Sequence, residues 1–456
     1  MNFNFHQKGF THTLKIKSLV RGFTLIEILV GTAVFILVAL AAYQSFGVLM
    51  NSVSVSRAKI AATAIANEKF EIIRNLPYQD VGIIGGLPAG KITRTENVLR
   101  DNYSFTIVTS IRSIDDPFDG TIDGIPNDLS PADYKMADLD ISCSNCKYSS
   151  ILNFTTLIAP HALESTSTNG ALFIRVFNSA GIPVPGASVH IVNTQTDPDT
   201  IIDEVTDNDG WLKIIDAVPG TNAYNITATK VGYSQDQTYP SDGVAGPNPV
   251  KLDATVVMQQ VTQVSFSIDL LSSLDVSSID NSCVALPSIP FTLSGAKLIG
   301  TPSVLKYSQT FTTNDTGLKN ITDLEWDLYS ISPSESAYDI AGTIPISPLS
   351  IDPNENKSIQ FIAVEHLNRA LLVSVRDSSG TAIDGASVHL QKSDFDQTKI
   401  TSTDLCETPG QVFWNGLETG NYTLTVTKTG YQASINSIDI TSSSPGWQQK
   451  NIVLVP

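Results

Sequence analysis

The sequence predicts an α+β module, formed by one long N-terminal helix and a small antiparallel sheet, followed by all-β sandwich domains. Three observations support this fold class: an apolar, helix-length run that begins at Phe23, short alternating segments rich in glycine, proline, serine and threonine after residue 100, and a motif that recurs beyond residue 170. At 456 residues the chain is also too long for one core, so we expect several domains.

The charge of the chain is unevenly distributed. Charged residues make up 16% of the sequence and the formal net charge is −17, so we expect no nucleic-acid partner, because phosphate binding needs a basic surface. Residues 1–22 are the exception, with no acid and four basic residues, Lys8, Lys15, Lys17 and Arg21. A basic head before an apolar run stays in the cytoplasm and sends the rest of the chain across the membrane.

The apolar run predicts a helix from residue 23 to residue 75, about 80 Å long at 1.5 Å per residue. Its first part, 23–46, is long enough to span a membrane. Its second part is expected to pack on a globular head, since apolar side chains recur at helical spacing as far as Pro77: Ala58, Ala61, Ala62, Ile65, Ile72, Ile73 and Leu76. The Ser-Val alternation at 52–56 leaves a strand as the alternative there.

One carboxylate, Glu27, interrupts the membrane segment. An acid inside a membrane helix costs about 2.5–3.5 kcal/mol and usually marks a function, although near a helix end it can also reach the headgroups. The stretch Gly22-Phe23-Thr24-Leu25-Ile26-Glu27, after a basic leader, resembles the cleavage and assembly signature of type IV prepilins and pseudopilins. Gln44 stands where that family often has a helix-kinking proline.

The resemblance implies that prepilin peptidase removes the leader, 1–22, by cutting between Gly22 and Phe23, and methylates the new amine of Phe23. It also implies that Glu27 of one subunit receives the Phe23 amine of its neighbour, which sets the register in a filament. Physically, an ammonium and a carboxylate that are each costly in an apolar bundle offset each other when paired. The rival interpretation is an ordinary signal peptide cut after Ala39-Leu40-Ala41, which leaves Glu27 unexplained.

The head is expected to occupy residues 90–163 of a pilin-like module, 23–163, with strands at 103–111, 133–142 and 151–160. The segment 65–82 resembles the end of the long helix in minor pilins and pseudopilins, and 164–170 is a linker by composition. Between the strands lie Asp115, Asp116, Asp119 and Asp123, with Asp128 and Asp133 further along. These acids make Ca²⁺ the one candidate cofactor, with the first four as ligands; an ordinary solvated loop is the alternative.

Four cysteines remain to be explained: Cys143, Cys146, Cys283 and Cys406. Zinc needs four ligands and no second CxxC exists, so Cys143 and Cys146 predict a small local disulfide or two unpaired thiols in an exported chain. Cys283 and Cys406 are candidates for a bridge between domains, which sequence alone does not establish.

Beyond residue 170 the chain repeats itself. GIPVPGASVHI at 181–191 matches GTAIDGASVHL at 380–390. A second pair of matching segments begins at Tyr224 and at Tyr422. Gly186 and Gly385 lie 199 residues apart, twice a sandwich of about 100 residues, which requires a third unit between them. A degenerate copy is present there, with Gly295 in the place of these glycines and Tyr329 in the place of the tyrosines. The expected sandwiches are 171–260, 261–366, which has diverged, and 367–456.

These units resemble carboxypeptidase regulatory-like domains, which are Ig- or transthyretin-like sandwiches, and this implies a fold more than a function. His190 and His389 hold equivalent strand positions and are expected to be surface histidines. Because no catalytic set has local support, we expect no enzyme.

The combined interpretation is a minor type IV pilin-like subunit whose sandwiches serve adhesion or contact with a partner, through an unknown extracellular ligand. The implied partners are prepilin peptidase, other pilin subunits, the assembly platform and the membrane. The chain would cross the cytoplasmic membrane once before assembly and then join a cell-surface filament, with its C-terminal domains outside. A minor pseudopilin of a type II secretion system and an exported, signal-anchored protein with a sandwich stalk remain alternatives.

Overall fold

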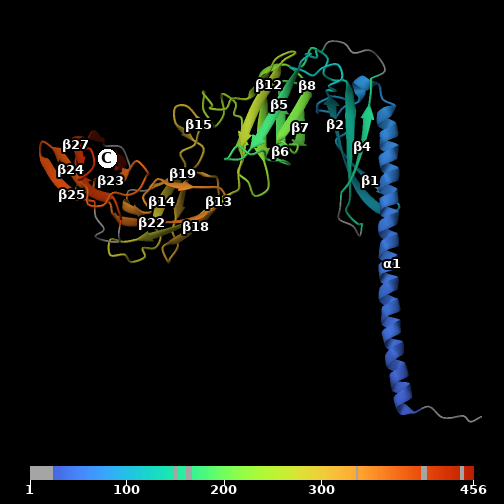
Figure 1. Ribbon diagram of the computed structural model, residues 1–456, viewed down its shortest axis with the longest axis horizontal. Coiled ribbons are helices and arrows are strands. Elements are labelled where there is room, and N and C mark those ends of the chain that lie inside the picture. The colour runs from blue at the N-terminus through green and yellow to red at the C-terminus, as the bar shows by residue number, and fades with distance from the viewer. Residues whose placement is uncertain (1–23, 147–150, 161–166, 335–336, 402–407, 442–445) are drawn as a thin grey trace, which may run out of the picture. The chain divides into compact units, whose positions relative to one another are not determined.

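The computed structural model describes the chain except for residues 1–23, 147–150, 161–166, 335–336, 402–407 and 442–445 (Figure 1). Contacts divide it into two compact units. The first holds residues 24–72, 95–108 and 139–154, and the second holds 73–94, 109–138 and 155–456. One long helix is followed by many β-sheets, which confirms the predicted fold class.

Helix α1 (Leu25–Arg74) is continuous, so the Ser-Val stretch at 52–56 is helical and not a strand. Isolated strands need a partner for their backbone groups, whereas a helix satisfies its own. The first half of α1 is exposed. Its second half buries a row of apolar side chains: Ala58, Ala61, Ala62, Ile65, Ala66, Phe70 and Ile73.

The buried row differs from the expected one at Ile72, which is 50% exposed, and at Leu76, which lies beyond α1 and is only partly buried; Ala66 and Phe70 are buried instead. The row follows four-residue steps along α1, and such rows rotate around the helix axis. By the last turn the buried face has therefore moved away from Ile72.

The four strands of the head are β1 (Thr95–Arg100), β2 (Tyr103–Ile114), β3 (Tyr134–Cys143) and β4 (Leu152–Ile158), in the sheet order β1-β2-β3-β4. A short 3-10 helix, η1 (Tyr78–Asp80), follows α1. Within the first unit, polar contacts join the second half of α1 to β1 and β2. Lys69 pairs with Glu96, Glu68 accepts from Arg100 at 2.7 Å, and the Ser54 and Tyr103 hydroxyls lie 3.1 Å apart.

A disulfide joins Cys143 and Cys146, whose Cα atoms are 5.5 Å apart. Cys283 is also disulfide-bonded, and Cys406 lies outside the described residues. Because the Cys143–Cys146 loop is so short, Cys143→Ser with Cys146→Ser should lower the free energy of unfolding by no more than about 2 kcal/mol. Denaturant titration with and without reductant measures this; a loss well above that would show that the bridge also holds native contacts together.

The first sandwich packs one sheet against another around a buried core that includes Leu172, Val189 and Phe266. One sheet has β5 (Gly170–Phe177), β8 (Trp211–Ala217) and β12 (Val261–Ser267). The other sheet consists of β6 (Ser188–Asn193), β7 (Thr200–Val205), β9 (Gly220–Thr229), β10 (Asp236–Gln237) and β11 (Ala254–Val256).

The end of the first sandwich differs from the expected boundary at residue 260. Strand β12 pairs in parallel with β5 along its whole length, from Val261 to Ser267, so these residues belong to the first sandwich. Sequence could not show this, because the pairing joins strands about 90 residues apart and leaves no local mark.

The second sandwich has a sheet of β13 (Ser272–Ile279), β18 (Leu318–Leu324), β20 (Tyr338–Ile344) and β22 (Asn356–Glu365). The sheet packed on it has β14 (Pro290–Ser294), β17 (Ser308–Thr312), β19 (Asp327–Pro333) and β21 (Leu349–Ile351). Strands β15 (Leu298–Gly300) and β16 (Val304–Leu305) form a separate two-stranded sheet.

The third sandwich joins β23 (Arg369–Asp377), β26 (Gln411–Leu417) and β29 (Trp447–Leu454) to a sheet of β24 (Ser387–Lys392), β25 (Phe395–Ile400), β27 (Gly420–Thr427) and β28 (Ser434–Ile440). In all three sandwiches the first strand pairs in parallel with the last strand of that sheet: β5 with β12, β13 with β22, and β23 with β29.

The three tyrosines that the repeat singles out share one environment. Tyr224, Tyr329 and Tyr422 are at most 2% exposed. Their hydroxyls donate to the carbonyl oxygens of Val218, Glu325 and Glu418, at 2.6, 2.8 and 3.1 Å respectively. Each tyrosine thus ties a core strand to the turn before it, as in a tyrosine corner.

The glycine of the middle repeat does not hold the position expected for it. Gly186 and Gly385 have φ of 64° and 66° and lie two residues before β6 and β24. The residue two before β14 is Ser288, also at positive φ (58°), whereas Gly295 follows that strand.

A buried threonine identifies the same position in all three units. In each unit the threonine hydroxyl accepts from the backbone N–H of the residue that follows the positive-φ residue. Thr206 accepts from Ala187, Thr313 from Ile289, and Thr401 from Ala386. Sequence comparison missed that Ser288 corresponds to Gly186 and Gly385, because a left-handed backbone position is expected to hold glycine.

Candidate functional site

The N-terminus of α1 is the first candidate site, because it carries the one acid of the apolar segment. Glu27 and Thr24 form reciprocal contacts there. The Glu27 backbone N–H donates to Thr24 Oγ1 at 3.3 Å, and Glu27 Oε2 accepts from the Thr24 hydroxyl at 3.4 Å and its N–H at 3.5 Å. This is a capping box, and it places a negative charge at the positive end of the helix dipole.

The capping box gives Glu27 a role within a single chain that sequence reasoning missed. The signal was present as Thr24-Leu25-Ile26-Glu27, the spacing in which a threonine and a glutamate satisfy each other's backbone groups. Gly22 and Phe23, the predicted processing residues, lie outside the described residues. Glu27 is therefore held at the first turn, close in sequence to the predicted new amine.

The surface of α1 beyond Glu27 is apolar and open. Residues 24–53 are exposed or partly exposed, and Phe35, Leu37 and Tyr43 are between 68% and 79% exposed. Within the described chain, α1 is the one helix long and apolar enough to cross a membrane, a property it shares with signal sequences near an N-terminus. Exposure of such a surface to water is unfavourable.

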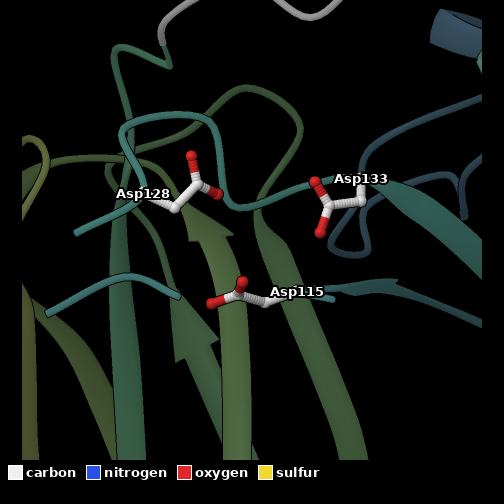
Figure 2. A group of neighbouring side chains, drawn as sticks. All are labelled: Asp115, Asp128 and Asp133. Carbon is white, nitrogen blue, oxygen red and sulfur yellow. The ribbon is translucent and has the colours of Figure 1, made fainter. Parts of the chain in front are cut away.

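The second candidate is a group of three acids in the loop between β2 and β3. Asp115 directly follows β2, Asp133 directly precedes β3, and Asp128 lies between them. One carboxylate oxygen from each lies within 4.8 Å of the others. Figure 2 shows the three carboxylates facing a common centre.

Backbone N–H groups hold each of these carboxylates in place. Asp115 Oδ2 accepts from Ile122 at 3.0 Å, Asp128 Oδ1 accepts from Ser130 at 2.8 Å, and Asp133 Oδ2 accepts from the N–H of Asp116. Burial raises the pKa of Asp115 above its ordinary value. The Ile122 N–H lowers this pKa, and the charges of Asp128, Asp133 and Asp119 raise it again.

Of the four residues predicted as calcium ligands, only Asp115 belongs to this group. Asp116 Oδ1 accepts from the Phe118 N–H at 3.1 Å, as in an Asx turn, while Asp119 and Asp123 are exposed. The two ends of the loop lie close together. Asp115 therefore meets acids that are distant from it in the sequence, and not the acids that follow it directly. Asp133 N–H donates to the Ile114 carbonyl at 3.1 Å, which closes the base of the loop.

The repeated histidines are exposed to solvent to differing degrees and pair with neighbouring acids. His190 Nδ1 lies 2.6 Å from Asp203 Oδ1, and His389 Nε2 lies 2.8 Å from Asp396 Oδ1. Each pair spans two adjacent strands of its sheet, β6 with β7 and β24 with β25. This arrangement fits surface cross-strand pairs.

No protein-family model matches the chain, and a comparison with curated proteins finds no match. Among solved structures, the Bacillus anthracis TIE protein is similar at 13% identity, with a TM-score of 0.20, over 78% of this chain and 72% of that chain. A streptococcal ancillary pilin matches at 13% identity and a TM-score of 0.18, covering 63% of this chain and 98% of its own. BcpA, the major pilin subunit of Bacillus cereus, matches at 11% identity and a TM-score of 0.16, covering 63% and 99%. Several of these similar chains are thus pilin subunits, but scores this low carry no inference about the present chain.

Proposed function

We propose that this chain is a minor type IV pilin-like subunit, which prepilin peptidase cuts between Gly22 and Phe23 and which passes from the membrane into a surface filament. The observation that carries the proposal is the division of α1. Its first half is apolar, open and capped by Glu27, and its second half is packed on the head. A helix with these two halves suits a subunit whose N-terminal segments bundle together while its folded domains face outward.

Glu27 would contribute twice in such a bundle. Its capping box begins the helix within each subunit, and its carboxylate would receive the methylated Phe23 amine of the next subunit. Pairing the two charges offsets the cost of placing either among apolar side chains. The three sandwiches would extend from the filament for adhesion or contact with a partner, and the proposal includes no enzymatic step.

Mass spectrometry of the mature N-terminus tests the proposal directly. Protein purified from its native membrane or from sheared filaments should begin at N-methylated Phe23 and lack residues 1–22. A chain that keeps its basic leader, or one that begins at Ala42, would contradict it and favour a signal anchor or an ordinary signal peptide. A chain processed at Phe23 whose deletion abolishes secretion of cargo but leaves surface filaments intact would instead be a pseudopilin.

A further inference from the structure

We propose that the loop between β2 and β3 binds one calcium ion through the carboxylates of Asp115, Asp128 and Asp133. This inference does not depend on the processing or assembly of the chain, since all three residues lie in the head. Asp115 and Asp133 stand at the two ends of the loop, and Asp128 lies five residues before its second end. An ion held by them would tie the end of β2 to the start of β3.

The spacing of the three oxygens suits calcium. Calcium–oxygen distances of about 2.3–2.6 Å allow two ligands of one ion to lie up to about 5 Å apart. The three carboxylate oxygens lie within 4.8 Å of one another. Calcium takes six to eight oxygen ligands, so backbone carbonyls or water would complete the shell.

The burial of the oxygens provides a second and independent observation. Although Asp128 as a whole residue is partly exposed, its side chain is buried. Its Oδ2 is shielded from solvent and receives no hydrogen bond, and the same holds for Asp115 Oδ1. An ionised oxygen without water or a donor is costly, and a cation is the partner that removes this cost for several such oxygens at once.

In each carboxylate, one oxygen accepts a backbone hydrogen bond and the second oxygen does not. The second oxygens indicate that the group does more than stabilise the turns of the loop. Each carboxylate uses one oxygen to accept from the backbone, from Ile122, Ser130 or Asp116. A carboxylate that served only as a cap would leave its second oxygen in water. Here the second oxygens of Asp115 and Asp128 are buried instead.

One of the three acids also lines a cavity. Asp115 lines a cavity of about 520 Å³, together with Thr121 and Ile122 of the same loop.

Isothermal titration of the full-length chain in detergent, after removal of metal with a chelator, tests the proposal. Calcium chloride should bind at one site per chain with a dissociation constant of about 10⁻³ M or tighter, as in extracellular calcium modules, and should raise the melting temperature. Asp115→Asn and Asp128→Asn should each weaken this binding at least tenfold. Calcium should also slow chymotryptic cleavage after Phe118, which is 95% exposed on this loop.

Asp123→Asn is the matched control, because it changes an exposed acid of the same loop and should keep calcium affinity within about twofold of the parent. Asp115→Asn should fold in chelator at least as well as the parent, since it removes one of three repelling charges, so its loss of binding is not a loss of fold. The proposal is overturned by the absence of heat and of a melting shift at 10 mM calcium, by a stronger response to magnesium than to calcium, or by an equal loss of binding in Asp123→Asn.

Discussion

We expect a chain that carries Glu27→Gln to remain in the membrane, to be processed at Phe23 and to be lost from filaments. Glutamine at this position still forms the capping box with Thr24, because an amide oxygen accepts the same hydrogen bonds. It cannot pair with the charge of a neighbouring amine. An uncompensated charge in an apolar environment costs about 3–5 kcal/mol, so incorporation should fall at least about a hundredfold.

The measurement is the amount of the variant in sheared filaments relative to the amount in the membrane, by quantitative immunoblotting. Thr24→Ala is one control, because it removes the other half of the capping box and should cost about 1 kcal/mol of helix stability without removing the charge. Gln44→Ala is another, since it changes a polar side chain of the same helix far from the first turn. If Glu27→Gln assembled normally while Thr24→Ala did not, capping would be the whole role of Glu27.

The second large effect is expected at Tyr422, which is 1% exposed in the core of the third sandwich. Its ring meets that of Phe395 edge to face at 5.5 Å, and its hydroxyl donates to Glu418. Tyr422→Ala leaves a cavity and should destabilise this sandwich by about 3–5 kcal/mol, which corresponds to a fall in its melting temperature of about 15–30 °C. Tyr422→Phe removes only the hydrogen bond and should cost about 0.5–1.5 kcal/mol.

Differential scanning calorimetry of the full chain can separate the sandwiches where they unfold independently, so the transition that moves should belong to the third. Tyr431→Phe, at a partly buried tyrosine that packs on the same core, is the matched control and should shift the transition little. An equal shift in every transition would show that the three sandwiches unfold as one unit. A loss below 1 kcal/mol for Tyr422→Ala would contradict the tyrosine's place in the core.

Local patterns in the sequence were sufficient for the elements with strong periodicity. The helix expected over 23–75 is observed as Leu25–Arg74, and the strand expected at 103–111 lies within β2. Tyr224 and Tyr422 were recognisable as equivalent because their neighbours repeat, and Tyr329 because it stands in the degenerate copy between them. These features depend on side-chain periods of 3.6 and 2, which are properties of short segments.

Contacts between distant segments could not be inferred in the same way. Strand β12 joined the first sandwich by pairing with β5, and Ser288 took a turn position that glycine holds in the other two repeats. In the head, closure of the loop grouped Asp115 with Asp128 and Asp133 and not with its neighbours Asp116, Asp119 and Asp123. The sequence by itself determined the long helix, the strands of the head and where the acids and tyrosines stand along the chain. Only the tertiary structure decided which strands pair and which carboxylates meet, because loop closure and strand pairing depend on the free energy of the whole fold and leave no periodic signal in the chain.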